Sequence, residues 1–180
     1  MNSFDKRKDA ARRSRGVTLL ETMVAMFILL FGIVSVASLF GVAVGKNKGH
    51  GEVATRTTEY CQDKMEQLMN LGFSDGATDT TVFPSNPLGG TGLGGTMAAN
   101  ATVGSVDPTN PVAGYVDYLD ETGNLLAGNA ANAFYTRQWS ITTDATGTLK
   151  TISVITVALS GAGDRGTAPS TQLVSRKTQF

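Results

Sequence analysis

The strongest hydrophobic pattern along the chain is a single uncharged run near the N-terminus. After Glu21, residues 22–45 contain no Asp, Glu, Lys or Arg, whereas both flanks are charged. At 1.5 Å per residue, a helix of this length spans roughly 36 Å, which exceeds the ~30 Å hydrocarbon thickness of a bilayer. A helix that is apolar on every side is typical of a membrane span. We therefore predict one membrane-spanning helix over residues 17–45.

The residues after this run change to an amphipathic helical pattern. Within residues 52–71, side chains suited to one buried face recur every three or four positions. These are Val53, Thr57, Cys61, Met65, Leu68 and Met69. Gly72 is a typical residue just beyond a helix C-terminus. We predict that residues 46–72 continue the helix and pack this face, with Cys61 in the core, on a head domain. The expected solvated face carries Glu59, Asp63, Lys64 and Glu66.

Residues 73–114 lose this periodicity and are rich in Gly, Thr, Asn, Ser and Pro. Such composition predicts a long loop region. Residues 90–95 (GTGLGG) match the spelling of a dinucleotide-binding fingerprint. That fingerprint needs a strand before it and a helix after it, and neither pattern is present here. We therefore assign this stretch to the loop.

Strand patterns return in residues 115–180. Short segments rich in β-branched and aromatic residues alternate with turn residues, as in an antiparallel sheet. The expected strands are Tyr115–Leu119, Phe134–Thr143, Leu149–Leu159 and Gln172–Gln179. Residues 120–124 and 144–147 are the expected turns, and the second predicts a hairpin. Together with the long helix, the pattern predicts an α+β fold in which a partly transmembrane helix packs on a small antiparallel sheet.

Strand alternation assigns individual side chains of this sheet. Tyr135 and Trp139 fall on one face, where we expect them to pack in the core, with anchoring of an interface as the alternative. Arg137 alternates with Gln138 and is expected to cap a sheet edge or to pair with a carboxylate.

Charge is distributed unevenly, although the net charge of the chain is zero. Residues 1–16 contain six Lys or Arg and two Asp, which leaves this segment at +4 and the remainder at −4. Basic residues stay on the cytoplasmic side of a span, so we expect a cytoplasmic N-terminus and an exported head. The remainder offers no second basic surface, and we expect no nucleic-acid partner.

The residues that usually carry catalysis are scarce. Cys61 and His50 are the only cysteine and histidine, which excludes an internal disulfide and an ordinary zinc site. A Ser-His-Asp triad would have to use His50, which lies between two glycines and is poorly placed to hold a base in register. We expect neither an enzyme nor a cofactor.

Two ordinary explanations of the N-terminus leave features unexplained. A cleaved secretory signal has an apolar region of about 7–15 residues, shorter than this run, although residues 43–45 form a weak cleavage site. A plain membrane anchor gives no reason for Glu21. A carboxylate at the mouth of a span is a functional-site hypothesis, and it requires a partner.

Residues 15–21 (RGVTLLE) resemble the prepilin cleavage motif of type IV pilins and type II secretion pseudopilins. The resemblance implies that a prepilin peptidase cuts after Gly16 on the cytoplasmic side and methylates the new N-terminus. Val17 would be the first mature residue, where the family usually has Phe, and Glu21 would be the fifth. The resemblance covers residues 12–70, so it includes both parts of the predicted helix.

The resemblance also implies a role for Glu21 in assembly. Once subunits pack, the amine of Val17 is a buried positive charge, and Glu21 of a neighbouring subunit can neutralise it. The alternative is that Glu21 favours the first helical turn through the helix dipole. Ser38 stands where many major pilins have Pro, which favours a minor pilin or a pseudopilin. Residues 135–139 (YTRQW) resemble the C-terminal sheet of PilV-type minor pilins and the I-type pseudopilin.

We therefore expect a minor type IV pilin subunit, with a type II secretion pseudopilin as the alternative. It would begin as a single-pass inner-membrane protein with a periplasmic head and then join the filament. The expected partners are the prepilin peptidase and methyltransferase, other pilin or pseudopilin subunits, and the inner membrane. A third hypothesis is a tip module in which residues 74–114 bind a surface, DNA or a secreted substrate.

Overall fold

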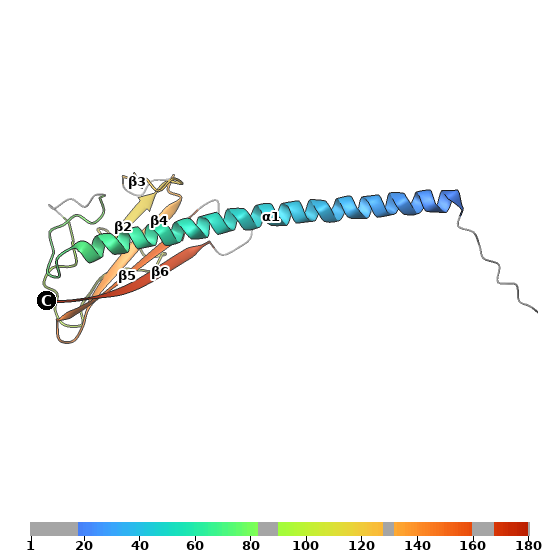
Figure 1. Cartoon of the computed structure of the whole chain (residues 1–180). Coiled ribbons are helices and arrows are strands. Elements are labelled where there is room, and N and C mark those ends of the chain that lie inside the picture. The colour runs from blue at the N-terminus through green and yellow to red at the C-terminus, as the bar shows by residue number, and fades with distance from the viewer. Residues whose placement is uncertain (1–17, 83–89, 128–131, 160–167, 180) are drawn as a thin grey trace, which may run out of the picture. The chain divides into compact units, whose positions relative to one another are not determined.

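The computed structural model describes residues 18–82, 90–127, 132–159 and 168–179. The expected leader, residues 1–16, lies outside these ranges. The described elements, in chain order, are α1 (Leu19–Asn70), β1 (Thr102–Gly104), β2 (Val116–Leu119), β3 (Leu125–Leu126), β4 (Tyr135–Thr143), β5 (Leu149–Ala158) and β6 (Ser170–Thr178) (Figure 1). The chain forms two compact units, Met1–Val44 and Gly45–Phe180, and each is described separately.

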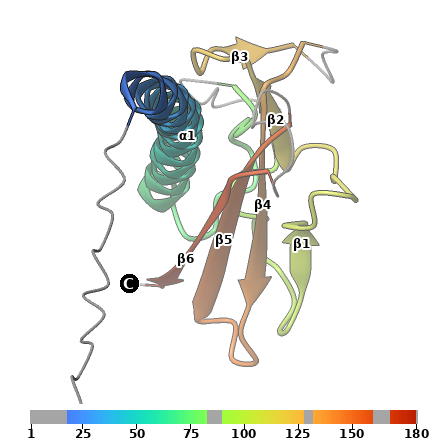
Figure 2. The same cartoon turned by 90° about the vertical axis from the view of Figure 1, so that its right-hand side faces the viewer.

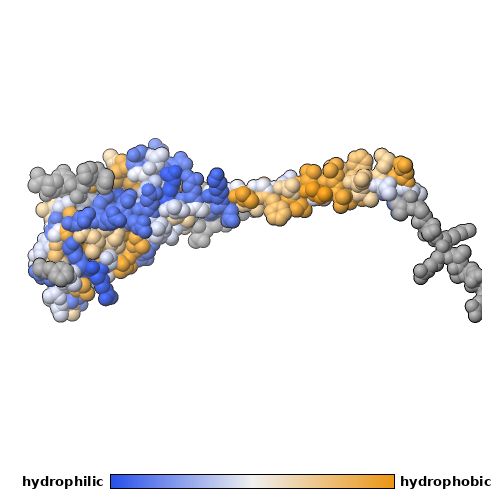
Figure 3. Space-filling model, viewed as in Figure 1, coloured by the Kyte–Doolittle hydropathy of each residue, from blue (hydrophilic) through white to orange (hydrophobic). Residues whose placement is uncertain are grey.

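The described part of the first unit is the N-terminal portion of α1. Thr18 caps the helix: its Oγ1 accepts a hydrogen bond from the Glu21 backbone N–H at 3.3 Å, and its carbonyl accepts one from Thr22 at 3.1 Å. Threonine is a favoured N-cap because its hydroxyl satisfies a donor that the helix leaves without a partner. Among the described helices, α1 alone is long and apolar enough to cross a membrane. The apolar residues of this portion are visible in Figure 3.

The second unit packs the remainder of α1 against an antiparallel sheet. The strand order is β3-β2-β4-β5-β6, and β1 also pairs with β4 (Figure 2). The single strand β4 therefore serves two partners along one edge: Tyr135–Gln138 pair with β2, and Ser140–Thr142 pair with β1. Its other edge pairs with β5 over its full length. The fold is α+β, as the sequence pattern predicts.

The β4–β5 hairpin forms at the predicted turn. The Asp144 carbonyl accepts a hydrogen bond from the Gly147 N–H at 3.2 Å, and its Oδ1 accepts bonds from the N–H groups of Thr148 and Leu149. Gly147 has φ of 75°, a conformation that glycine adopts without the steric cost of a Cβ. The register that follows pairs Tyr135 with Ala158 and Thr143 with Lys150.

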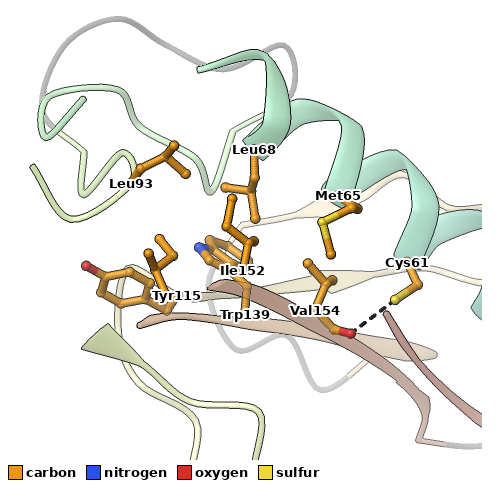
Figure 4. Close-up of a cluster of buried hydrophobic side chains, with 9 residues drawn as sticks. Cys61, Met65, Leu68, Leu93, Tyr115, Trp139, Ile152 and Val154 are labelled. Atoms are coloured by element: carbon orange, nitrogen blue, oxygen red, sulfur yellow. Dashed lines mark hydrogen bonds between the residues drawn. The ribbon is translucent and has the colours of Figure 1, made fainter. Parts of the chain in front are cut away.

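The core lies between α1 and one face of the sheet. Its larger part joins helix residues to side chains of β4 and β5 and to two residues of the connecting segments (Figure 4). The fully buried members are Cys61, Leu68, Leu93, Trp139, Ile141, Ile152 and Val154. The smaller part comprises Tyr60, Leu119, Tyr135 and Ala158. Strand alternation places Tyr135 and Trp139 on this face, as predicted, because successive side chains point to opposite sides.

The connection from helix to sheet differs from the expected long loop. Residues 102–104 form β1, and Leu93 is fully buried in the main core. Short strands of this kind carry too few residues to show periodicity, and the burial of one leucine depends on partners elsewhere in the chain. The two-residue strand β3 was likewise not predicted, and α1 ends at Asn70 rather than at residue 72.

Candidate functional site

The first candidate site is the start of α1. The sequence Thr18-Leu-Leu-Glu21 places Glu21 three residues after the N-cap, where a carboxylate also interacts favourably with the helix dipole. Within the described residues, no ion pair or hydrogen bond involves the Glu21 carboxylate. The scissile bond expected between Gly16 and Val17 lies outside the described residues. The sequence signal for this cap is the Thr-x-x-Glu pattern of residues 18–21, which is typical of a capping box. The cap at Thr18 was not among the predictions from the sequence.

The surface around Glu21 is apolar and uncovered. Every residue from 18 to 49 is exposed, and the large side chains include Phe27, Phe31 and Phe40, each more than half exposed. A continuous exposed apolar surface of this size marks contact with a membrane or with other protein chains. The helix continues through Gly32 and Gly41, and a Cβ at either position would meet no atom within 4 Å. We therefore expect a membrane or other protein chains to cover the apolar surface of this portion of α1.

A second set of polar residues is buried between α1 and the sheet. The Asp117 carboxylate on β2 forms an ion pair with the Lys64 ammonium at 2.7 Å. It also accepts hydrogen bonds of 2.9 and 3.0 Å from the Arg137 guanidinium on β4. Arg137 also donates to the Tyr60 carbonyl at 3.0 Å. The expectation that Arg137 meets a carboxylate is thus confirmed.

Lys64 does not lie on the solvated face that the sequence pattern predicted. Its side chain is 1% exposed, it donates to the Thr80 carbonyl, and its ammonium lies 4.4 Å from the centroid of the Trp139 ring. Burial lowers the pKa of Lys64 to about 8, although the charge of Asp117 opposes this shift. The cluster is buried from solvent, so its role is structural. Its ion pairs and hydrogen bonds hold together α1, the sheet and the segment that follows α1.

Lys150 is a third buried polar residue, and it holds the segment between α1 and β1 in place. The Lys150 ammonium donates to the carbonyls of Phe73, Leu93 and Gly95 at 2.7 to 2.8 Å. Burial lowers the pKa of Lys150, against the opposing charge of Asp75. A strand lysine thus satisfies three carbonyls of a segment that lies more than fifty residues earlier in the chain.

The glycine-rich stretch at residues 90–95 serves this packing, and the helix that a dinucleotide-binding fingerprint requires does not follow it. Gly92 donates to the Thr78 carbonyl, and Leu93 and Gly95 donate to the Asp75 carbonyl, all at 2.8 Å. Residues 96–101 are not helical. A Cβ at Gly90 would lie 1.9 Å from the Thr78 oxygen, so close backbone approach explains this glycine.

The cysteine is a core residue. Cys61 is fully buried and its Sγ donates to the Val154 carbonyl at 3.3 Å (Figure 4). Burial raises the pKa of its thiol, which disfavours the reactive thiolate. In the part of the chain that the structure describes, no group of three or more His, Cys, Asp or Glu side chains could hold a metal ion.

Comparison with known proteins identifies the N-terminal segment. Residues 11–37 match the family model described as the prokaryotic N-terminal methylation motif. This range contains Gly16, Val17 and Glu21 and ends within the apolar portion of α1. No curated protein and no solved structure matches the chain.

Proposed function

We propose that the chain is a minor subunit of a type IV pilus, because residues 11–37 match the prokaryotic N-terminal methylation motif. The motif implies processing by a prepilin peptidase, and we assign cleavage to the bond after Gly16 and methylation to the amine of Val17. The subunit is held in the inner membrane by α1, with its N-terminus in the cytoplasm and its head in the periplasm. From there it joins the filament.

The observation that carries this proposal is the coincidence of the methylation motif with an exposed apolar helix that bears one carboxylate. The match at residues 11–37 overlaps the exposed portion of α1, and Glu21 is the single charged residue from 18 to 45. Lipid covers this surface before assembly, and neighbouring helices cover it in the filament. A carboxylate buried among helices is costly without a partner.

Glu21 obtains that partner from a neighbouring subunit. Cleavage creates a free amine at Val17, four positions before Glu21, and both groups lie at the same end of α1. An ion pair between Glu21 of one subunit and Val17 of the next neutralises two charges that would otherwise be buried alone. It also sets the axial offset between the two helices. In the unassembled subunit, Glu21 instead interacts with the helix dipole near its Thr18 cap.

Residues 135–139 resemble both the PilV-type minor pilins and the I-type pseudopilin, so a secretion pseudopilin is the second candidate function. The two functions have the same processing and the same helix. Deleting the gene separates them: loss of surface filaments supports the minor pilin, whereas loss of exported substrates with intact filaments supports the pseudopilin.

The decisive experiment is the intact mass of the chain recovered from membranes of cells with and without a prepilin peptidase. We expect a peptidase-dependent species that begins at Val17 and is heavier by one methyl group. A chain cut near residue 45, or one left intact in both strains, contradicts the proposal. A chain that begins at Val17 without the methyl group supports processing and overturns the assignment of methylation.

A further inference from the structure

The sheet has one long edge that no described strand covers. β6 is the last strand of the order β3-β2-β4-β5-β6, and among the described residues it pairs only with β5 (Figure 2). On the opposite side of the sheet, β1 and β3 contain three and two residues, whereas β6 contains nine. The register of β6 with β5 is unbroken from Ser170 to Val157 and from Thr178 to Leu149. Short strands thus protect one side of the sheet, while a long, regular strand leaves the other side open to pairing.

Alternate residues of β6 direct their main-chain N–H and C=O groups away from the sheet. At the two ends of the pairing, Ala158 donates to the Pro169 carbonyl and Gln179 donates to the Thr148 carbonyl. In an antiparallel pair, residues that bond to the partner strand alternate with residues whose N–H and C=O groups point the other way. Odd-numbered residues therefore bond to β5, and the even-numbered residues from 170 to 178 face outward. Their unpaired groups match the main chain of one further extended strand.

The side chains of these outward-facing residues lie on the side of the sheet turned away from α1. The odd-numbered residues of β6 face the helix: Thr171 bonds to a helix threonine, and Leu173 packs against the core. Lys177 also faces the helix and donates to one of its carbonyls. Val174 is 59% exposed, and Arg176 is exposed as well. Within the described residues, no hydrogen bond or ion pair involves the Arg176 guanidinium, so it is the one charge on β6 that an added strand would meet without competition.

A second copy of this chain does not fit the edge in a membrane. In the second unit β6 runs in the same direction as α1, because Thr171 contacts Thr57 and Lys177 contacts the Met69 carbonyl. Two β6 strands joined in one sheet by a two-fold axis are antiparallel, so their α1 helices would point in opposite directions. Helices anchored with one polarity in one membrane exclude this pairing. The exclusion rests on the proposed membrane location.

We propose that β6 is the docking edge for an extended segment of a different protein, which joins the sheet as an antiparallel strand. The segment carries a carboxylate opposite Arg176 and a β-branched residue opposite Val174. Because antiparallel pairing reverses the order, the segment reads Asp/Glu-x-Val/Ile from its N-terminus. Opposite charges directly across two strands stabilise an antiparallel sheet, whereas like charges destabilise it. Arg176 therefore favours acidic segments and disfavours basic ones.

The test uses the full chain in detergent and three fluorescent peptides, with binding measured by anisotropy. The first peptide, TTTETVTTT, has the proposed pattern, and the second has Lys in place of Glu. The third has an N-methyl group on the nitrogen of its Val, which removes one main-chain donor and leaves the side chains unchanged. We expect the first peptide to bind about tenfold more tightly than the second, through charge, and than the third, through the lost hydrogen bond.

Amide hydrogen exchange followed by NMR locates the bound strand. In the free chain, the amides of Gln172, Val174 and Arg176 should exchange rapidly, whereas those of Leu173 and Ser175 are protected by β5. A saturating amount of the first peptide should slow the exchange of the first set at least tenfold and leave the second set unchanged.

Variants of β6 separate its main chain from its charge. Val174→Pro removes an outward N–H without breaking a bond to β5, because proline is tolerated on an edge strand, and it should weaken binding about tenfold. The matched control Val174→Thr keeps both the N–H and the β-branched shape and should bind like the unmodified chain. Arg176→Glu should reverse the preference, so that the Lys peptide binds more tightly than the Glu peptide.

Equal binding of the Glu and Lys peptides, or no reversal in Arg176→Glu, overturns the proposed pattern. Binding that leaves the even-numbered amides in rapid exchange overturns the docking edge. A dimer of the unmodified chain that Val174→Pro converts into a monomer assigns the edge to a second copy and also overturns the proposal. None of these results depends on cleavage after Gly16, so they leave the proposed pilin function to its own test.

Discussion

Lys64 on α1 and Asp117 on β2 form an ion pair of 2.7 Å, with side chains only 1% and 2% exposed. Asp117 also accepts two hydrogen bonds from Arg137, so one buried carboxylate contacts two buried cations. Charges buried in this way require partners with good geometry. Because the three side chains come from α1, β2 and β4, they are satisfied together in one register of the helix on the sheet. We infer that the cluster specifies this register.

Removing the shared carboxylate should be the most damaging single change in the head. Asp117→Asn leaves Lys64 and Arg137 as neighbouring buried cations, and we expect a loss of about 3–5 kcal/mol in the free energy of unfolding. Thermal unfolding of the full chain in detergent, followed by the fluorescence of Trp139, measures it. Asp63→Asn, at an exposed position of α1, is the control and should change stability by at most ~0.5 kcal/mol. Similar losses in the two variants would show that the cluster has no special role.

The lowered pKa of Lys64 predicts an unusual dependence of stability on pH. The pKa of Lys64 in the folded chain is about 8, whereas the ordinary pKa of a lysine is 10.5. Between these values the unfolded chain binds more protons than the folded chain, so this residue makes the fold more stable as pH rises. Below pH 8 the contribution is constant and unfavourable.

The comparison with Lys64→Met isolates this contribution. The raised pKa of Cys61 acts in the opposite direction above about pH 9, but it is common to both proteins. The stability of the unmodified chain, minus that of Lys64→Met, should therefore increase from pH 8 to pH 10. A difference that stays flat or decreases across this range would contradict the assignment of a lowered pKa to Lys64.

Lys150 should control the mobility of the connecting segment more than that of the sheet. Lys150→Met leaves the carbonyls of Phe73, Leu93 and Gly95 without their donor, and each lost bond costs about 1 kcal/mol or more. We expect faster amide hydrogen exchange in residues 72–82 and 90–95, measured by mass spectrometry. Lys177→Met, which loses its bond to the Met69 carbonyl, is the matched control. Its exchange should rise at the end of α1 and remain unchanged in residues 90–95.

Glu21 should be dispensable for processing and necessary for assembly. Glu21→Ala removes the partner proposed for the Val17 amine, so we expect cleavage after Gly16 to continue while incorporation into filaments falls at least tenfold, a factor equal to ~1.4 kcal/mol. Immunoblots of membrane and sheared filament fractions measure both steps. Glu59→Ala, at an exposed position of α1, is the control. Incorporation of Glu21→Ala at the level of the unmodified chain would show that the proposed pairing is wrong.

The features that the sequence determined by itself are those encoded in neighbouring residues. An uncharged run long enough to span a bilayer identifies the apolar portion of α1, whatever the rest of the chain does. The Arg15–Glu21 motif, the β4–β5 hairpin and the alternation that buries Trp139 are equally local, because helix period, strand period and turn chemistry each act over a few positions. Cys61 could be assigned to the core for the same reason.

The tertiary structure decided where the exceptions to these patterns lie. On the helix alone, Lys64 belongs with Glu59 and Asp63, and its burial depends on Asp117, a partner more than fifty residues away in the chain. Lys150 and Leu93 meet only when the segment between α1 and β1 folds back over the sheet. β1 pairs with Ser140–Thr142, the part of the β4 edge that β2 leaves free. A buried charge is acceptable only where a distant partner meets it. Contacts of this kind arise only when the chain packs, so no periodic pattern in the sequence predicts them.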